Sequence, residues 1–170
     1  MTHLHSTSDE DNARQRRALT GLVIEVFRLN GDLLAAGDAL VGDLGLTSAR
    51  WQVLGAVALS PVPLPVAHIA RNMGLTRQAV QRTVDEMRGD GFVCLEPNPH
   101  HQRAMLVTMT EQGEAAYSAA SERQGRWAEA LAADLSPESI KAAGDLLREL
   151  QRRLTAPTTT KVAIIKSEET

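Results

Sequence analysis

A short segment of the chain carries side chains of the kind that proteins use to read DNA bases. Gln78, Gln81 and Arg82 fall within five residues, and on a helix Gln78 would lie one turn below Arg82. In the major groove, glutamine can pair bidentately with adenine and arginine with guanine. These residue types therefore point to recognition of double-stranded DNA. A solvated polar helix face is the alternative when the segment is taken by itself.

The other side of the same segment is apolar, as a helix packed on a core requires. Val80, Val84 and Met87 cluster on one face at about 100° per residue. Thr76 can cap the helix by accepting a hydrogen bond from a backbone N–H of the first turn. Arg77 would then stand at the start of the helix, within reach of a DNA phosphate. The pattern predicts a helix after Thr76 with one buried face and one DNA-facing face.

A second, shorter helix is predicted directly before this one. Pro65 suits a first helical turn, where its missing N–H is not needed. Ile69 and Met73 share one face, and Gly74 follows as a helix-ending glycine. Two helices joined by a glycine-containing turn of about three or four residues form a helix-turn-helix, whose second helix can enter the major groove.

A β-hairpin is predicted after the helix-turn-helix. Residues 92–96 alternate loosely in strand fashion, and residues 104–109 form a second apolar-rich run. The loop between them is polar and holds two prolines, which excludes a continuous helix. A helix-turn-helix followed by such a hairpin is a winged helix, with the loop as its wing. The wing residues predicted to bind DNA are His100, His101 and Arg103.

Four stretches of the sequence carry a resemblance to the MarR family of bacterial transcription regulators. They are LTSARWQVL at 46–54, VAHIARNMGLT at 66–76, VDEMRGDGFV at 84–93 and RAMLVTMTEQG at 103–113. The resemblance spans roughly residues 14–154, and the wing is its most specific part. It implies a winged-helix transcription regulator, and we expect a repressor.

The chain departs from the family pattern at two positions. His101 stands where family wings usually carry an aspartate, two residues before the wing arginine. That acid commonly orients the arginine, so the departure bears on the posture of Arg103. Pro65 replaces a serine or threonine that often precedes the first helix of the motif, which removes a cap and a phosphate contact.

The charge of the chain is unevenly distributed. The 170 residues carry a net charge of −3, which by itself argues against a nucleic-acid partner. Residues 48–110, however, hold six arginines against four acidic residues. A modestly basic module in an acidic chain can still bind DNA phosphates when it is dimerised. The acidic balance and the missing wing aspartate slightly favour the alternative, a winged-helix module that binds protein and not DNA.

Long helices are predicted on both sides of the winged module, which spans residues 46–110. Residues 13–45 place apolar side chains three and four apart, as an amphipathic helix does. Residues 111–154 contain an alanine-rich helix and then a helix with a narrow apolar seam. Residues 1–12 are polar and predicted to be a loose arm, and residues 155–170 are predicted to be a tail.

The predicted fold is therefore mainly α-helical with a small β-hairpin, a winged helix-turn-helix flanked by N- and C-terminal helices. In the resembled family the terminal helices intertwine as a two-fold dimer interface, so a homodimer is expected. Packing of the seam within one chain is the alternative. Two-fold symmetry would place two recognition helices about one DNA turn apart on a pseudo-palindromic site.

A small-molecule effector is also expected from the resemblance. In the family the effector pocket lies where the first helix, the helix of Trp51 and the long helix after the wing converge. Ligand sites are mostly apolar with a few convergent polar groups. Trp51 offers an aromatic wall, and Arg28 or Arg50 could meet a carboxylate bidentately. An aromatic acid is the first ligand class that these residues suggest.

Motifs for other chemistry are missing from the sequence. It contains no G-x-G-x-x-G, no P-loop, no H-E-x-x-H and no paired-cysteine zinc pattern, so we expect no enzyme, no cofactor and no metal. It also lacks an apolar run of about 18 residues and a signal peptide, which predicts a cytoplasmic protein without a membrane partner.

The single cysteine excludes an intramolecular disulfide. Cys94 lies in a predicted strand beside Phe92 and Val93, so an inert core thiol is expected. A thiol-based redox regulator acting through Cys94 is the alternative. His68 is expected to be a partly buried packing residue.

Overall fold

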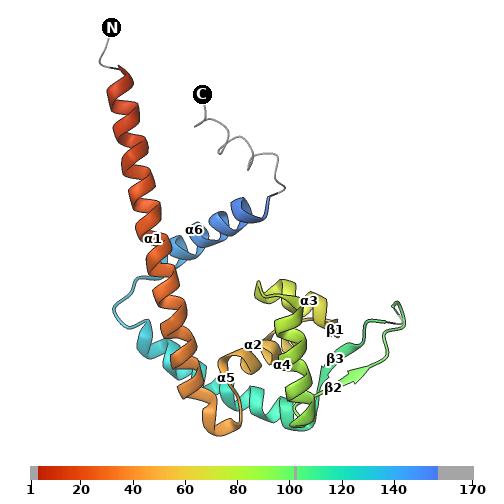
Figure 1. Ribbon diagram of the computed structural model, residues 1–170. Helices are drawn as coiled ribbons and strands as arrows, with labels where there is room; N and C mark the ends of the chain where they lie inside the picture. Colours follow the sequence, from red (N-terminus) through yellow and green to blue (C-terminus); the bar gives the residue numbers. More distant parts are fainter. Residues whose placement is uncertain (1–3, 102, 157–170) are drawn as a thin grey trace. The chain divides into compact units, whose positions relative to one another are not determined.

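The structure is a computed structural model that describes residues 4–101 and 103–156 (Figure 1). The chain divides into two compact units, one that runs to Gly125 and one from Arg126, and the boundary falls within the long helix α5. The fold is mainly helical with one small antiparallel sheet, as predicted. The elements are α1 (Leu4–Val41), η1 (Gly42–Leu44), α2 (Ser48–Ala58), β1 (Leu64–Pro65), α3 (Val66–Met73), α4 (Arg77–Gly89), β2 (Val93–Glu96), β3 (Leu106–Met109), α5 (Glu111–Leu131) and α6 (Pro137–Thr155).

Helices α3 and α4 form the predicted helix-turn-helix. Gly74 ends α3 with a φ of +66°, a left-handed conformation that residues with a Cβ rarely adopt. The Thr76 hydroxyl caps α4 by accepting a hydrogen bond from the N–H of Ala79 at 3.2 Å. The predicted apolar face of α4 is buried. It consists of Val80, Val84 and Met87.

The sheet has three strands and not the two of a simple hairpin. Its order is β1-β3-β2, with both pairings antiparallel. Strand β1 pairs Leu64 with Val107, and Pro65 belongs to this edge strand, where a missing N–H is tolerated. The prediction that Pro65 occupies the first turn of α3 is therefore wrong. Pro65 is the N-cap of α3, and its backbone is extended.

Side chains alternate across β2, and this decides the position of the cysteine. Val93 is buried and Leu95 is half-buried, so Cys94 between them points to the other face and is exposed. The expectation of a buried core thiol is wrong for this reason. The Cys94 Sγ lies 3.0 Å from the Thr108 hydroxyl on β3.

Helix α2 packs closely on the end of α1. Thr47 caps α2 by accepting from the N–H of Arg50 at 3.3 Å. The Ser48 hydroxyl donates to the Leu34 carbonyl at 2.7 Å, and a Cβ on Gly37 would run into that hydroxyl. Close packing thus explains Gly37, but a Cβ at Gly31, like one at Gly21, would meet nothing within 4 Å.

Helix α1 begins at Leu4, so the loose arm predicted for residues 1–12 does not hold from Leu4 onward. Extending a formed helix is favourable, because each added residue gains a hydrogen bond, whereas starting one is costly. Glu10 also precedes Arg14 by four positions, a spacing at which opposite charges support a helix. Several large apolar side chains of α1 are exposed. They are Leu19, Val23, Ile24, Val26, Phe27, Leu29, Leu33 and Leu34.

Helix α5 is bound at its start to the turn before β2 and further along to η1. The Thr110 hydroxyl accepts from the N–H of Gly113 at 3.1 Å and donates to the Gly91 carbonyl at 2.6 Å. Further along, the Arg123 guanidinium donates to the Asp43 carboxylate, and this hydrogen bond holds the pKa of Asp43 below its usual range. The Ala-rich helix after the wing therefore belongs, over this part, to the first unit.

The second unit contains the end of α5 and helix α6. The Ser136 hydroxyl caps α6 by accepting from the N–H of Ser139 at 3.1 Å, and Pro137 occupies the first turn. The apolar seam is exposed at Ile140, Leu147 and Leu154. The predicted tail lies outside the described residues from 157 onward. No helix in the part of the chain that the structure describes is long and apolar enough to cross a membrane.

Candidate nucleic-acid interface

The polar face of α4 is open to solvent along its length. Arg77, Gln78 and Arg82 are exposed, and Gln81 is partly buried. A shallow hollow of about 680 Å³ follows this face. Thr76 begins the face and is exposed, although its hydroxyl already caps the helix. The side chains predicted to read bases therefore lie together on one surface.

Two carboxylates on α4 pair with these side chains, and the sequence reasoning assigned them no role. Arg82 donates through Nε to Glu86 Oε1 at 3.0 Å, and Gln81 donates through Nε2 to Asp85 Oδ2 at 3.2 Å. Both pairs are four residues apart, which is the spacing at which helix side chains meet. The sequence alone therefore indicates that these side chains can pair.

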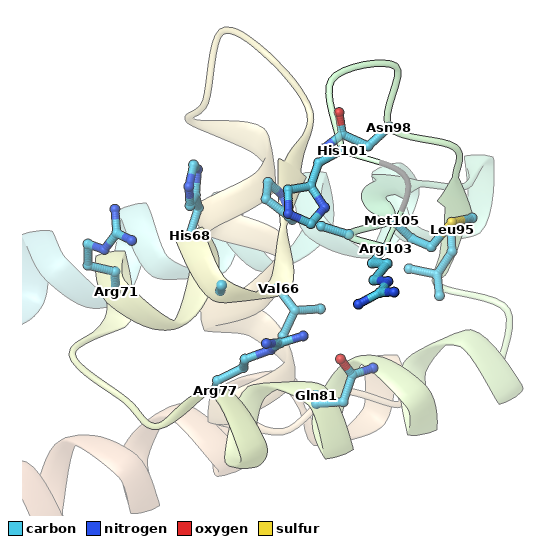
Figure 2. Close-up of a pocket in the computed structure, with 13 residues that line it drawn as sticks. Val66, His68, Arg71, Arg77, Gln81, Leu95, Asn98, His101, Arg103 and Met105 are labelled. Atoms are coloured by element: carbon cyan, nitrogen blue, oxygen red, sulfur yellow. The ribbon is translucent and has the colours of Figure 1, made fainter.

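A second hollow, of about 660 Å³, lies between α3, α4 and the wing (Figure 2). Arg103 extends from the wing toward the side of α4 that carries Arg77 and Gln81 (Figure 2). The described side chains that line the hollow include five arginines and histidines and no acidic residue. These five are His68, Arg71, Arg77, His101 and Arg103.

The wing tip is organised by Asn98, three residues before the position where the family pattern places an aspartate. The side-chain oxygen of Asn98 accepts from the N–H of His100 at 2.9 Å. The backbone carbonyl of Asn98 accepts from the N–H of His101 at 3.2 Å. Both histidines are exposed, and only His101 lines the hollow. Among the described residues, no carboxylate lies within ion-pair distance of Arg103, which is exposed and faces the hollow.

Helix α3 contributes two side chains that sequence reasoning did not assign to a DNA-facing surface. His68 was expected to be partly buried, but it is exposed, because Ile69 and Ala70 are the residues of α3 that face the core. Arg71, one turn along, is exposed on the same side. Their spacing of three, beside two apolar residues, is the signal that identifies this face.

The residues predicted for an effector site are only partly brought together. Trp51 is half-buried, and its ring lies 4.0 Å from the position that a Cβ on Gly37 would take. Arg50 pairs with Asp90 at 2.8 Å and donates to the Gly45 carbonyl at 3.2 Å. Arg28 lies nine residues before Gly37, about 13 Å along the helix, and pairs with Glu25 at 2.8 Å.

No group of three or more histidine, cysteine, aspartate or glutamate side chains among the described residues could hold a metal ion. The exposed Cys94 meets one requirement for a reactive thiol, which is access to solvent.

Residues 44–104, the core of the winged module, match the sequence profile of the MarR family. An uncharacterized protein of Mycobacterium tuberculosis (strain H37Rv) is 36% identical over 129 residues, which are 76% of this chain and 89% of that protein. The transcriptional activatory protein BadR of Rhodopseudomonas palustris is 32% identical over 94 residues, 54% of each chain. The chain belongs to the MarR family of transcription regulators, which are not enzymes.

A solved structure shows the same fold. The M. tuberculosis regulator MosR, in a crystal structure with DNA, superimposes with a TM-score of 0.64 at 21% identity, covering 76% of this chain and 95% of MosR. The likeness extends beyond the winged module, because the matched region is larger than residues 44–104.

Proposed function

We propose that the protein binds pseudo-palindromic double-stranded DNA as a homodimer and represses transcription. The observation that carries this proposal is the acid-free hollow between α3, α4 and the wing, where five arginine and histidine side chains converge beside the polar face of α4. Phosphate contacts supply most of the affinity of a DNA-binding protein. A surface that gathers cations from three elements fits a phosphate backbone better than it fits a protein partner.

The two surfaces would divide the work between backbone and bases. Arg71, Arg77 and Arg103 line the hollow and would hold phosphates, which fixes the position of the protein without reading sequence. Gln78 and Arg82 lie on the open face of α4 and would read base edges in the major groove. The exposed Thr76 and Gln81, with His100 and His101 on the wing, complete the proposed contact surface.

A dimer is proposed because apolar surface on the flanking helices has no partner among the described residues of either unit. Eight large apolar side chains of α1 are exposed, and the seam of α6 is exposed within the second unit. A soluble monomer rarely leaves so much contiguous apolar surface in water. A two-fold dimer that buries these helices would also present two copies of α4 to DNA. MosR, which has the same fold, was crystallised with DNA, and this agrees with the proposed use of the fold.

Repression is proposed because a bound dimer blocks a promoter without needing any further contact. The relative BadR is described as a transcriptional activatory protein, so activation is the alternative outcome. Transcription in a purified system, from a promoter that overlaps the selected DNA site, would fall on addition of the protein if it is a repressor. A rise in transcript would replace repression with activation.

The DNA proposal is tested by selecting fragments from random double-stranded DNA with the pure protein. We expect enrichment of a pseudo-palindrome whose half-sites lie about one helical turn apart. Absence of any enriched sequence, with the protein folded, would favour the winged-helix module that binds protein. A single asymmetric half-site would retain DNA binding but contradict the dimer.

A small-molecule effector is proposed at the half-buried Trp51, where α1, α2 and the first part of α5 meet. A Cβ on Gly37 would lie 4.0 Å from Trp51, and the Tyr117 ring of α5 lies 3.8 Å from where a Cβ on Gly55 would be. An aromatic acid would stack on these rings, and its carboxylate would have to compete with Asp90 for Arg50. A part for Arg28 is less well supported, because it lies far along α1.

A ligand can release DNA only if it binds the DNA-incompetent arrangement of the dimer more tightly than the competent one. The test is a titration of simple aromatic carboxylates into a preformed protein–DNA complex, with Trp127 replaced by phenylalanine so that the fluorescence reports Trp51. Release of DNA with a saturable fluorescence change would support the effector. No response at millimolar ligand would remove the aromatic-acid proposal.

A further inference from the structure

The arginine proposed to read guanine is held by a carboxylate on its own helix. Arg82 donates through Nε to Glu86 Oε1 at 3.0 Å, one helical turn further along α4. The Arg82 side chain is 84% exposed and that of Glu86 is 48% exposed, and both line the shallow hollow along the polar face of α4. An acid at this place needs a reason, because it repels the phosphates of the same DNA.

The geometry of the pair leaves the reading edge of Arg82 available. A guanidinium is a rigid planar fork with five N–H donors. The contact to Glu86 uses the Nε edge, so the two terminal nitrogens are left to donate. Two donors are what the N7 and O6 acceptors of a guanine require. Glu86 can therefore keep its hold on Arg82 while Arg82 binds the base.

Glu86 itself is approached from a second helix. Arg50 on α2 is only 19% exposed, pairs with Asp90 at 2.8 Å and reaches Glu86 Oε2 at 4.0 Å. Its guanidinium also donates to the Gly45 carbonyl at 3.2 Å, which anchors it to the backbone before α2. Arg50 thus attracts one oxygen of the Glu86 carboxylate while the other accepts from Arg82, so the carboxylate is held between two guanidinium groups.

We propose that Glu86 is a positioning residue that directs Arg82 toward a guanine and away from DNA phosphates. The carboxylate orients the guanidinium plane, and its charge disfavours an approaching phosphate but not a neutral base edge. This inference rests on the proposed DNA-binding function. It assigns Glu86 a role in sequence discrimination, whereas an acid in a DNA interface would ordinarily only weaken binding.

The test compares Glu86→Ala and Glu86→Gln with the matched control Asp85→Asn. Asp85 is the neighbouring acid on α4 and contacts Gln81 and Arg88 but not Arg82. Each protein is titrated with three DNAs: the selected site, the same site with one guanine replaced, and non-specific DNA. The replaced guanine is the one that the wild-type protein prefers and the Arg82→Ala variant does not.

We expect Glu86→Ala to lower the preference for that guanine about two- to fivefold, the range of an exposed ion pair, while binding to non-specific DNA becomes tighter. Glu86→Gln should recover part of the preference, because its amide oxygen can still accept from Nε. Asp85→Asn should tighten non-specific binding without changing the preference. In the Arg82→Ala background, Glu86→Ala should leave the preference unchanged.

A guanine preference that survives Glu86→Ala, or that falls equally in Asp85→Asn, would overturn the inference while DNA binding stands. Weaker binding to all DNA by Glu86→Ala would mean that Glu86 supports the helix only, and would overturn it too. If the wild-type protein selects no DNA sequence, the proposed function fails and this inference fails with it.

Discussion

Arg103 is the residue through which the wing brings positive charge to the hollow. Its guanidinium faces the hollow with no carboxylate in ion-pair distance among the described residues, so its charge is free to meet a phosphate. Each neutralised phosphate contributes about 0.9 to the slope of log affinity against log salt concentration.

Arg103→Ala should therefore weaken binding to every DNA sequence to a similar degree and lower the salt slope by about one per protomer. Fluorescence anisotropy at several salt concentrations measures the slope. Arg126→Ala, which removes an exposed arginine outside the hollow, serves as the control and should leave the slope unchanged. An unchanged slope in Arg103→Ala would place the wing away from DNA.

Single residues were predictable where their effect is local. The cap at Thr76 follows from the residue type and its distance from the first helical turn, and it is confirmed. The pairing of Arg50 with Asp90 joins residues forty positions apart, and no local pattern specifies it. Cys94 has apolar neighbours but is exposed, because the alternation of β2 places its side chain on the face opposite to Val93 and Leu95.

At the scale of elements, the contact between α1 and α2 requires a glycine, because a Cβ at position 37 would collide with α2. Gly37 lies against the Ser48 hydroxyl, which is itself bound to the Leu34 carbonyl at 2.7 Å. A methyl group there must displace the hydroxyl or separate the helices, and such overpacking costs about 1–3 kcal/mol.

Gly37→Ala should therefore lower the free energy of unfolding by about 1–3 kcal/mol, measured by chemical denaturation. Gly31→Ala is the matched control on the same helix. Open space surrounds Gly31, so the higher helix propensity of alanine should raise stability by up to about 1 kcal/mol. Equal effects of the two substitutions would contradict the packing of α1 on α2.

Helix α6 carries a pH-sensitive cluster of three charged side chains. Hydrogen bonds from Arg152 and Arg153 lower the pKa of Glu149 from 4.5 to about 2. Because the folded pKa is lowered, the stabilising contribution is fully present above 4.5 and is lost as the pH falls toward about 2. The stability difference between wild type and Glu149→Gln should shrink over that interval, measured by denaturation at a series of pH values. A difference independent of pH would contradict the pairing.

Elements were predicted well where an apolar period coincided with a cap. The helix-turn-helix, the wing strands and α6 agree with the sequence to within a few residues. The start of α1 was predicted too late in the chain, because residues 4–12 are polar and lack the three- and four-residue spacing of apolar side chains. They are helical because they extend the amphipathic helix that follows them. The third strand was not predicted, because its pairing with β3 joins residues about forty positions apart and no local pattern specifies such a contact.

At the scale of the whole molecule, the account depends on a dimer made by the terminal helices. A chain that ends at Leu135 lacks α6 and should dissociate or aggregate, because the apolar surfaces that α6 covers in the dimer become exposed. Light scattering with size-exclusion chromatography measures the mass of both proteins. A full-length protein that is folded and monomeric would contradict the proposed assembly.

The central claim is that α4 reads DNA bases, and Arg82 tests it most directly. The measurement is the affinity of wild type and Arg82→Ala for the selected DNA site and for the same site with the contacted guanine replaced. Wild type should prefer the guanine by about 1–3 kcal/mol, and Arg82→Ala should lose that preference while retaining its salt-dependent binding to DNA. Equal affinity of the two proteins for both sites would contradict base reading by α4.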